Sequence, residues 1–219
     1  TIMEFKTQVT QHAENTYSLH INLDHGFMTP DDLLKIAELA KKHNVTKMMC
    51  TTAKKISFYN TPEEEVNPLW DDLVATFGDR LRTPKGKVIV CPGKGVCKFA
   101  MEGFDGHKMA DDIIAISKAH NAGKIKAAVS TCPRRCSSTQ VRDIGVFAAG
   151  KGWTVTFGGN GGTKPSAGEV VATGLSHEEA VTLVDKLYQY IEEKKDGGER
   201  TARLLARLGL DDVKAYIAE

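Results

Sequence analysis

The stretch Ser130–Ser138, STCPRRCSS, places Cys132 and Cys136 directly after residues 124–130 (KIKAAVS), a short apolar run of the kind that forms a β-strand. A second pair, Cys91 and Cys97, follows another such run, residues 85–90 (KGKVIV). In open α/β sheets, ligands bind beyond the carboxyl ends of the strands. The sequence therefore predicts a sheet whose carboxyl edge carries two cysteine loops.

Helix and strand patterns flank these runs. A helix is predicted from Pro30 to about His43, a strand at 45–52 (VTKMMCTT) and a second helix at 62–78, so residues up to about 84 form a strand–helix–strand–helix unit. Further predictions are a helix at 107–120, two strands and a glycine-rich loop within 144–165, a helix opened by a capping box at Ser176, and a helical end over 196–219. The fold class is thus α+β or α/β.

Composition is that of an ordinary globular chain of 219 residues, with 29 Lys plus Arg against 28 Asp plus Glu. The overall charge gives no sign of a nucleic-acid partner, and none is expected. No apolar run approaches the roughly 20 residues of a membrane span, and no signal-peptide pattern opens the sequence. We expect a cytoplasmic protein with no membrane partner, in which clustered cysteines are metal ligands or redox groups more often than bridges.

The spacing of the cysteines limits the kinds of site that they can form. Five residues separate Cys91 from Cys97 and three separate Cys132 from Cys136. Zinc sites favour two to four residues between paired ligands, and redox dithiols need two residues between their cysteines. A four-iron four-sulfur cluster accepts varied spacings. The remaining alternative is four unrelated buried thiols. Cys50 stands alone in a predicted strand and is expected to be a core residue.

At these residues the sequence resembles the sulfite and nitrite reductase family, which couples such a cluster to siroheme. That family has Cys-x5-Cys followed by Cys-x3-Cys, with Cys-Pro opening the second pair as at Cys132-Pro133. Residues 21–58 resemble its first subdomain, and 155–166 (VTFGGNGGTKPS) resemble its GGN siroheme loop. The likeness spans about residues 17–195 and covers one repeat, as in the low-molecular-weight assimilatory-type sulfite reductases.

The resemblance implies an organisation and a set of site residues. A ferredoxin-like subdomain would occupy 1–84, a siroheme and 4Fe-4S binding subdomain 85–195, and a helical extension 196–219. The cluster ligands would be Cys91, Cys97, Cys132 and Cys136, with Cys136 also bridging to the siroheme iron. Anionic groups of siroheme would meet Arg134, Arg135, Gly159, Asn160, Gly161 and Lys164. Cations for the substrate would come from Lys54, Lys55, Lys47 and Lys126, where Lys54 stands at a position at which the family usually has arginine.

The function implied is the six-electron reduction of sulfite to sulfide, fed by a low-potential electron donor protein. Nitrite reduction of the same type is an alternative, as are a non-catalytic iron–sulfur electron carrier and, less well supported by the spacing, a zinc-binding module. Two-repeat members take most substrate cations from the half that this sequence lacks. The first segment or a second copy would have to cover that face, so both a monomer and a homodimer remain open.

Overall fold

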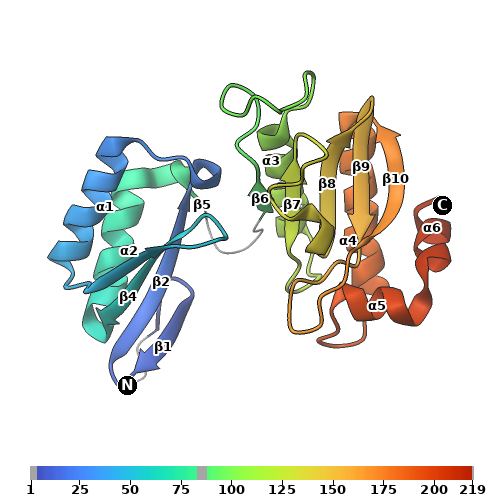
Figure 1. Cartoon of the computed structure of the whole chain (residues 1–219). Helices are drawn as coiled ribbons and strands as arrows, with labels where there is room; N and C mark the ends of the chain where they lie inside the picture. The colour runs from blue at the N-terminus through green and yellow to red at the C-terminus, as the bar shows by residue number, and fades with distance from the viewer. Residues whose placement is uncertain (1–3, 83–87, 219) are drawn as a thin grey trace. The chain divides into compact units, whose positions relative to one another are not determined.

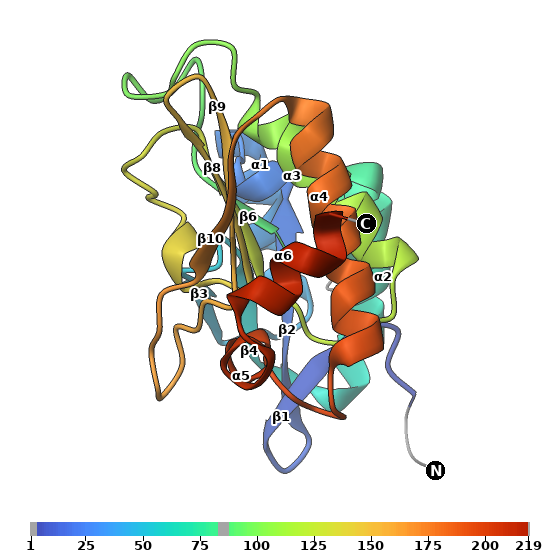
Figure 2. The same ribbon diagram turned by 90° about the vertical axis from the view of Figure 1, so that its right-hand side faces the viewer.

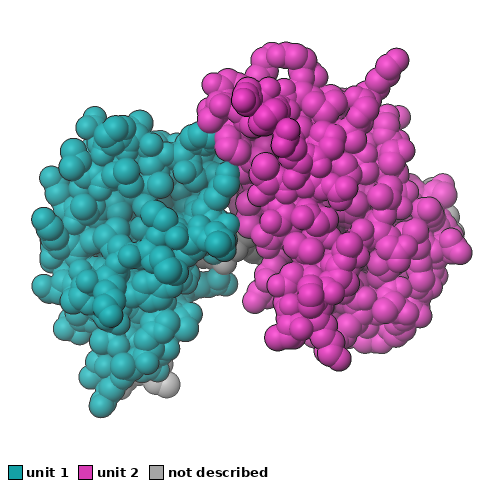
Figure 3. All heavy atoms as spheres, in the orientation of Figure 1, with its two compact units in different colours: residues 1–84 teal, residues 85–219 magenta. Residues whose placement is uncertain are grey.

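The computed structural model describes residues 4–82 and 88–218, and for Arg82 only the backbone. Two compact units divide the chain, residues 1–84 and residues 85–219 (Figure 3). Each has its own hydrophobic core. In the described part of the chain no helix has the length and apolar character to cross a membrane.

The first unit is an antiparallel sheet with two helices. Its strands pair in the order β1-β2-β4-β3, and β5 pairs with β2 at the end of that strand. The elements are β1 (Val9–Ala13), β2 (Thr16–Leu23), α1 (Pro30–Lys42), β3 (Lys47–Cys50), β4 (Ile56–Pro62), α2 (Glu63–Phe77) and β5 (Leu81–Arg82), with short 3-10 turns η1 (Asp24–Gly26) and η2 (Gly78–Arg80).

Successive residues of β2 lie on opposite faces of the sheet, and those on one face contribute to the core of this unit. Leu19 and Ile21 are buried on one face of the sheet, where they meet α1 and α2, while Ser18 and His20 point to the other face. The Thr29 side chain caps α1 and Pro30 starts it, as the sequence predicts. The predicted strand–helix–strand–helix order was incomplete, because β1, β4 and β5 were not recognised.

The second unit is a mixed sheet of order β10-β9-β8-β7-β6 with helices against it. Strands β6, β7 and β8 are parallel, and β9 and β10 run antiparallel to their neighbours. Its elements are β6 (Val88–Val90), α3 (Gly106–Ala119), β7 (Ala127–Ser130), η3 (Thr139–Val141), β8 (Ile144–Ala149), β9 (Gly152–Phe157), β10 (Glu169–Leu175), α4 (His177–Lys194), α5 (Thr201–Leu208) and α6 (Leu210–Ala218).

Strands β7, β8 and β9 are buried along their whole length except for Ala149, so both faces of the sheet are covered. Helices α3 and α4 lie on one side, and the segment that follows β7 lies on the other (Figure 2). Leu204, Leu205 and Val213 of α5 and α6 enter the same core as the strands. Residues 196–219, expected to form an extension, therefore belong to the packing of this unit.

Candidate functional site

Two cysteine loops leave the sheet side by side. Cys91 follows β6, Cys132 lies two residues after β7, and the two strands are parallel neighbours in register at Val90 and Val129. The backbone N–H of Thr131 donates to Cys91 Sγ at 3.2 Å, and the Thr131 hydroxyl lies 3.3 Å from the same sulfur. The N–H of Met101 in turn donates to the Thr131 carbonyl at 2.9 Å. Hydrogen bonds thus hold the two loops together at the carboxyl edge of the sheet.

The four thiols of these loops are free and differ in exposure. Cys91 and Cys132 are buried, Cys97 is half-buried and Cys136 is exposed, so each pair has one inner and one outer sulfur. Among the described residues, no three His, Cys, Asp or Glu side chains lie close enough together to hold a single metal ion.

A cuboidal cluster is wider than one ion, and its thiolate ligands accept backbone N–H bonds such as that from Thr131 to Cys91. Gly93 and Gly95, inside the first loop, have φ of +73° and +86°, a left-handed backbone that glycine adopts without strain. The donor set and the shape of the loop therefore fit an iron–sulfur cluster.

The two arginines of the second loop stack on aromatic rings. The Arg134 guanidinium lies 3.8 Å from the centroid of the Phe99 ring, which belongs to the first loop, and Arg135 lies 4.3 Å from that of Phe147 on β8. Such contacts between a guanidinium and a ring are attractive. Arg134 therefore links the two cysteine loops, a role that the sequence pattern does not reveal because Phe99 carries no signal of its own.

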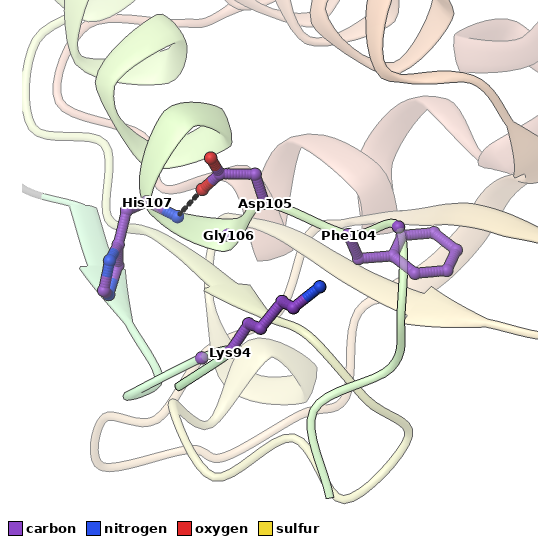
Figure 4. Close-up of a pocket in the computed structure, with 7 residues that line it drawn as sticks. Lys94, Phe104, Asp105, Gly106 and His107 are labelled. Atoms are coloured by element: carbon purple, nitrogen blue, oxygen red, sulfur yellow. Dashed lines mark hydrogen bonds between the residues drawn. The ribbon is translucent and has the colours of Figure 1, made fainter. Parts of the chain in front are cut away.

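A hollow of about 470 Å³ lies between the first cysteine loop and the start of α3 (Figure 4). It is lined by Gly93, Lys94, Gly103, Phe104, Asp105, Gly106 and His107. The Asp105 side chain caps α3 by accepting from the N–H groups of His107 and Lys108. Lys94 pairs with Glu102 at 2.6 Å, which raises the pKa of the lysine. The charge of Lys94 in the lining is thus balanced by Glu102.

The glycine-rich loop lies at the other end of the sheet from the cysteines. It follows Phe157, which pairs with Ile144 at the start of β8, whereas Cys132 follows the last residue of β7. Asn160 shapes the loop, because its Nδ2 donates to the Lys164 carbonyl and its Oδ1 accepts from the Gly162 N–H. The Asn160 side chain is therefore engaged within its own loop.

The loop is nevertheless attached to the segment that continues from the second cysteine pair. A Cβ at Gly159 would lie 2.5 Å from the Arg142 carbonyl oxygen and 2.9 Å from that of Gln140, so only glycine permits this approach. The N–H of Gly168 donates to the Gln140 carbonyl at 2.8 Å. Gly161 lies beside Val141. The expected siroheme residues thus fall into two groups joined by the chain from Cys136 to Arg142.

The four candidate lysines lie at separate places in the two units. Three of them, Lys47, Lys54 and Lys55, belong to the first unit, and Lys126 belongs to the second. Lys54 and Lys55 lie in the turn between β3 and β4, and a Cβ at Gly26 would meet Lys54 Cβ at 2.8 Å, so this turn adjoins η1. Lys47 begins β3, at the other end of that strand. Lys126 precedes β7, at the end of the strand away from the cysteines, and burial lowers its pKa.

Cys50 is not a core residue. It ends β3, an edge strand whose four residues are all exposed, and its thiol is free. The apolar run Met48–Cys50 indicates burial, but the position of its strand at the edge of the sheet determines the outcome. The prediction for Cys50 was therefore wrong.

Family comparisons place these two units in known domains. Residues 77–219 match the nitrite and sulphite reductase 4Fe-4S domain. Residues 9–76 match the nitrite/sulfite reductase ferredoxin-like half domain. The sheet with α1 and α2 is thus the ferredoxin-like half domain, and the unit that carries both cysteine pairs is the 4Fe-4S domain.

Individual proteins agree with this assignment. The chain is 28% identical to an assimilatory-type sulfite reductase of Nitratidesulfovibrio vulgaris, over 98% of each chain. It is 30% identical to the NAD(P)H nitrite reductase of Bacillus subtilis over 93% of its own length, although it spans only 25% of that protein.

Two solved structures share the fold. NirA of Mycobacterium tuberculosis matches 96% of this chain and 41% of its own, with a TM-score of 0.76 and 18% identity. Dissimilatory sulfite reductase I matches 93% of this chain and 69% of its own, with a TM-score of 0.79 and 11% identity. The two family matches together run from residue 9 to residue 219, and the chain belongs to the nitrite and sulphite reductase family of oxidoreductases, whose cofactors are a 4Fe-4S cluster and siroheme.

Proposed function

We propose that this protein reduces sulfite to sulfide at a siroheme coupled through the Cys136 thiolate to a 4Fe-4S cluster. The observation that carries the proposal is the joining of two cysteine loops, by bonds from Thr131 to Cys91, at the carboxyl ends of adjacent parallel strands. The similarity to an assimilatory-type sulfite reductase over 98% of both chains supports sulfite as the substrate.

The reaction takes up six electrons and six protons for each hydrogen sulfite ion. Its three S–O bonds break, and hydrogen sulfide ion and three water molecules form. The electrons come singly from a low-potential donor protein, and the cluster and siroheme, when bound, supply their storage and transfer to sulfur. The chain itself supplies the cofactor ligands and the cations that bind the anionic substrate.

The exposure of the thiols suggests how the four ligands divide their roles. Cys91 and Cys132 are buried against the sheet, where a sulfur can face only the cluster. Cys136 is exposed, so its sulfur has room for a second metal on the opposite side. We therefore assign Cys91, Cys97 and Cys132 to the cluster alone and Cys136 to both cofactors.

For the substrate, Lys54 and Lys55 are the best placed of the four candidate lysines, because they are adjacent in one turn. Two ammonium groups favour a small oxyanion and help to deliver protons to its oxygens. Lys47 starts β3 and lies at the end of that strand away from the turn. Lys126 precedes β7 and lies at the end of that strand away from the cysteine loops.

Two measurements test this function. The visible spectrum of the purified protein should show the Soret and long-wavelength bands of siroheme above the broad cluster absorption. Cys136→Ser should lose sulfite reduction with a reduced dye as donor, while Cys50→Ser, which alters an exposed thiol outside the site, should keep it. Full activity of Cys136→Ser would refute the bridging role, and a spectrum with cluster bands only would favour an electron carrier.

Nitrite is the second candidate substrate. The 30% identity to an NAD(P)H nitrite reductase favours it, although the chain corresponds to only a quarter of that enzyme. Sulfite and nitrite turnover should be compared on the same preparation with the same reduced dye. A higher kcat/KM for nitrite would replace sulfite reduction with nitrite reduction as the function.

A further inference from the structure

The segment Thr139–Arg142, which connects the second cysteine loop to β8, contains three buried polar atoms that have no hydrogen-bond partner among the described residues. They are Thr139 Oγ1, Gln140 Oε1 and Arg142 Nε. Folded proteins leave few such atoms unsatisfied, and a group of them calls for a ligand or an ordered water. Thr139 and Gln140 belong to η3 and Arg142 directly follows it, so the three atoms occur within four consecutive residues.

Arg142 is the charged member of this group, and it forms no ion pair with any residue that the structure describes. Its guanidinium is half-buried, and burial lowers its pKa despite the neighbouring negative charge of Asp143. The Asp143 carboxylate is occupied elsewhere. It accepts from the Lys126 N–H at 2.8 Å and the Thr201 hydroxyl at 2.5 Å, and it pairs with Arg200.

No other carboxylate of residues 4–82 or 88–218 is found in an ion pair with Arg142. A half-buried charge without a partner costs free energy that a bound anion would offset. The structure therefore holds Arg142 in a form suited to an anionic ligand.

The surrounding backbone fixes this site from one side. Gly159 packs against the backbone of Gln140 and Arg142, and Gly168 donates to the Gln140 carbonyl. Figure 2 shows this part of the chain on the side of the sheet away from α3 and α4. The same continuous segment begins at Cys136, six residues before Arg142.

We propose that Arg142, together with Gln140, binds a carboxylate of siroheme. The proposal rests on the proposed function, which supplies an anionic macrocycle held through Cys136. A guanidinium binds carboxylate in a charge-assisted, two-pronged arrangement, and the Gln140 amide can present its nitrogen by rotation. Arg134 and Arg135 already stack on Phe99 and Phe147, whereas Arg142 has no such contact among the described rings.

The test compares full-length Arg142→Met with the unaltered protein. Siroheme is measured by its Soret absorption and the cluster by labile sulfide, so that their ratio reports siroheme binding independently of activity. We expect the cluster content to be retained and the affinity for siroheme to fall about tenfold or more, as for loss of a hydrogen bond to a charged group. Arg142→Lys, which keeps the charge but not the fork, should lose less.

Thermal unfolding of full-length protein made without siroheme separates binding from a structural role. Arg142→Met should then unfold at the same or a higher temperature, because it removes an uncompensated charge. Arg200→Met, the matched control, should unfold at a lower temperature because it leaves the buried Asp143 carboxylate with fewer donors.

An unchanged siroheme-to-sulfide ratio in Arg142→Met, or destabilisation of the siroheme-free variant, would overturn the proposal. If the unaltered protein contains a cluster but no siroheme, the proposed function fails instead. The two failures are thus distinguishable on the same preparations.

Discussion

At the scale of single residues, Thr131 supplies the hydrogen bonds to one proposed cluster ligand, Cys91. Its N–H and its hydroxyl both lie within hydrogen-bond distance of Cys91 Sγ, which is buried. When the sulfur is a thiolate, both groups donate to it. Hydrogen bonds to ligand sulfurs stabilise the more negative, reduced state of a cluster and so raise its reduction potential.

Thr131→Val removes the hydroxyl and leaves the backbone bond. We expect the reduction potential of the cluster to fall, because the oxidised state loses less stabilisation than the reduced state. A hydrogen bond of about 1 kcal/mol corresponds to on the order of 40 mV for one electron. Redox titration followed by electron paramagnetic resonance measures the shift. Thr131→Ser keeps the hydroxyl and should restore the potential, and an equal shift in both variants would contradict this role.

The sequence alone predicts which cysteines could bind a cluster, but not the contacts between the loops that carry them. The spacing of Cys91, Cys97, Cys132 and Cys136 singles out the two loops that the structure joins. The stacking of Arg134 on Phe99 depends on a contact between loops 35 residues apart, which no local pattern encodes. Cys50 was misplaced for the same reason, since exposure at a sheet edge depends on strand order.

At the scale of elements, the same histidine arrangement joins a helix pair in each unit. His43 follows α1, and its ring nitrogens lie 2.6 Å from Glu65 and 2.7 Å from Asp72 of α2. His120 follows α3, and its ring nitrogens lie 2.7 Å from Glu192 and 2.9 Å from Asp185 of α4. In both cases the two carboxylates are seven residues apart, on one face of the helix. When the His120 ring is protonated, it also interacts favourably with the C-terminal end of α3.

His120→Gln should make unfolding less dependent on pH. Burial opposes protonation of His120, but the bonds to Glu192 and Asp185 outweigh it and raise the pKa of the ring. The stabilisation is therefore complete at pH values below the pKa of the histidine in the unfolded chain, about 6.5. It is lost as the pH rises through the higher pKa of His120 in the folded protein. We expect the variant to lose about 1 kcal/mol of unfolding free energy at pH 6 and progressively less at higher pH.

Denaturant unfolding at a series of pH values measures this difference. His12→Gln is the control, because the His12 ring bonds the Ser18 hydroxyl and no carboxylate is involved in that contact. If His120→Gln lowered the unfolding free energy by the same amount at every pH, His120 would act by packing and not through its charge.

The helices were more predictable than the strands. Thr29 with Pro30, and Ser176 with Glu179, mark the starts of α1 and α4 because capping is local chemistry. Strands β1, β4 and β10 were missed because they have neither a long apolar run nor a regular alternation of buried and exposed residues. Irregular pairing of β10 with β9 and of β1 with β2 weakens the alternation further.

At the scale of the whole molecule, cofactor ligands and proposed substrate cations belong to different compact units. All four proposed cluster cysteines and Arg142 lie in residues 85–219, whose core is made from that unit alone. Lys54 and Lys55 lie in residues 1–84. The sequence likeness to a one-repeat reductase runs over both units and therefore accounts for both sets of residues.

Residues 85–219 produced alone should fold and assemble the cluster, because the core and all four thiols are present. Sulfite binding should be lost, since each absent lysine removes a charge-assisted contact of about 1.5–3 kcal/mol, or roughly tenfold or more in affinity. Folding is measured by circular dichroism, cluster assembly by labile sulfide, and sulfite binding by the spectral shift on sulfite addition. Full-length Lys54→Gln combined with Lys55→Gln should keep both cofactors and reproduce the loss. Undiminished sulfite binding by the fragment would place the substrate cations within the second unit instead.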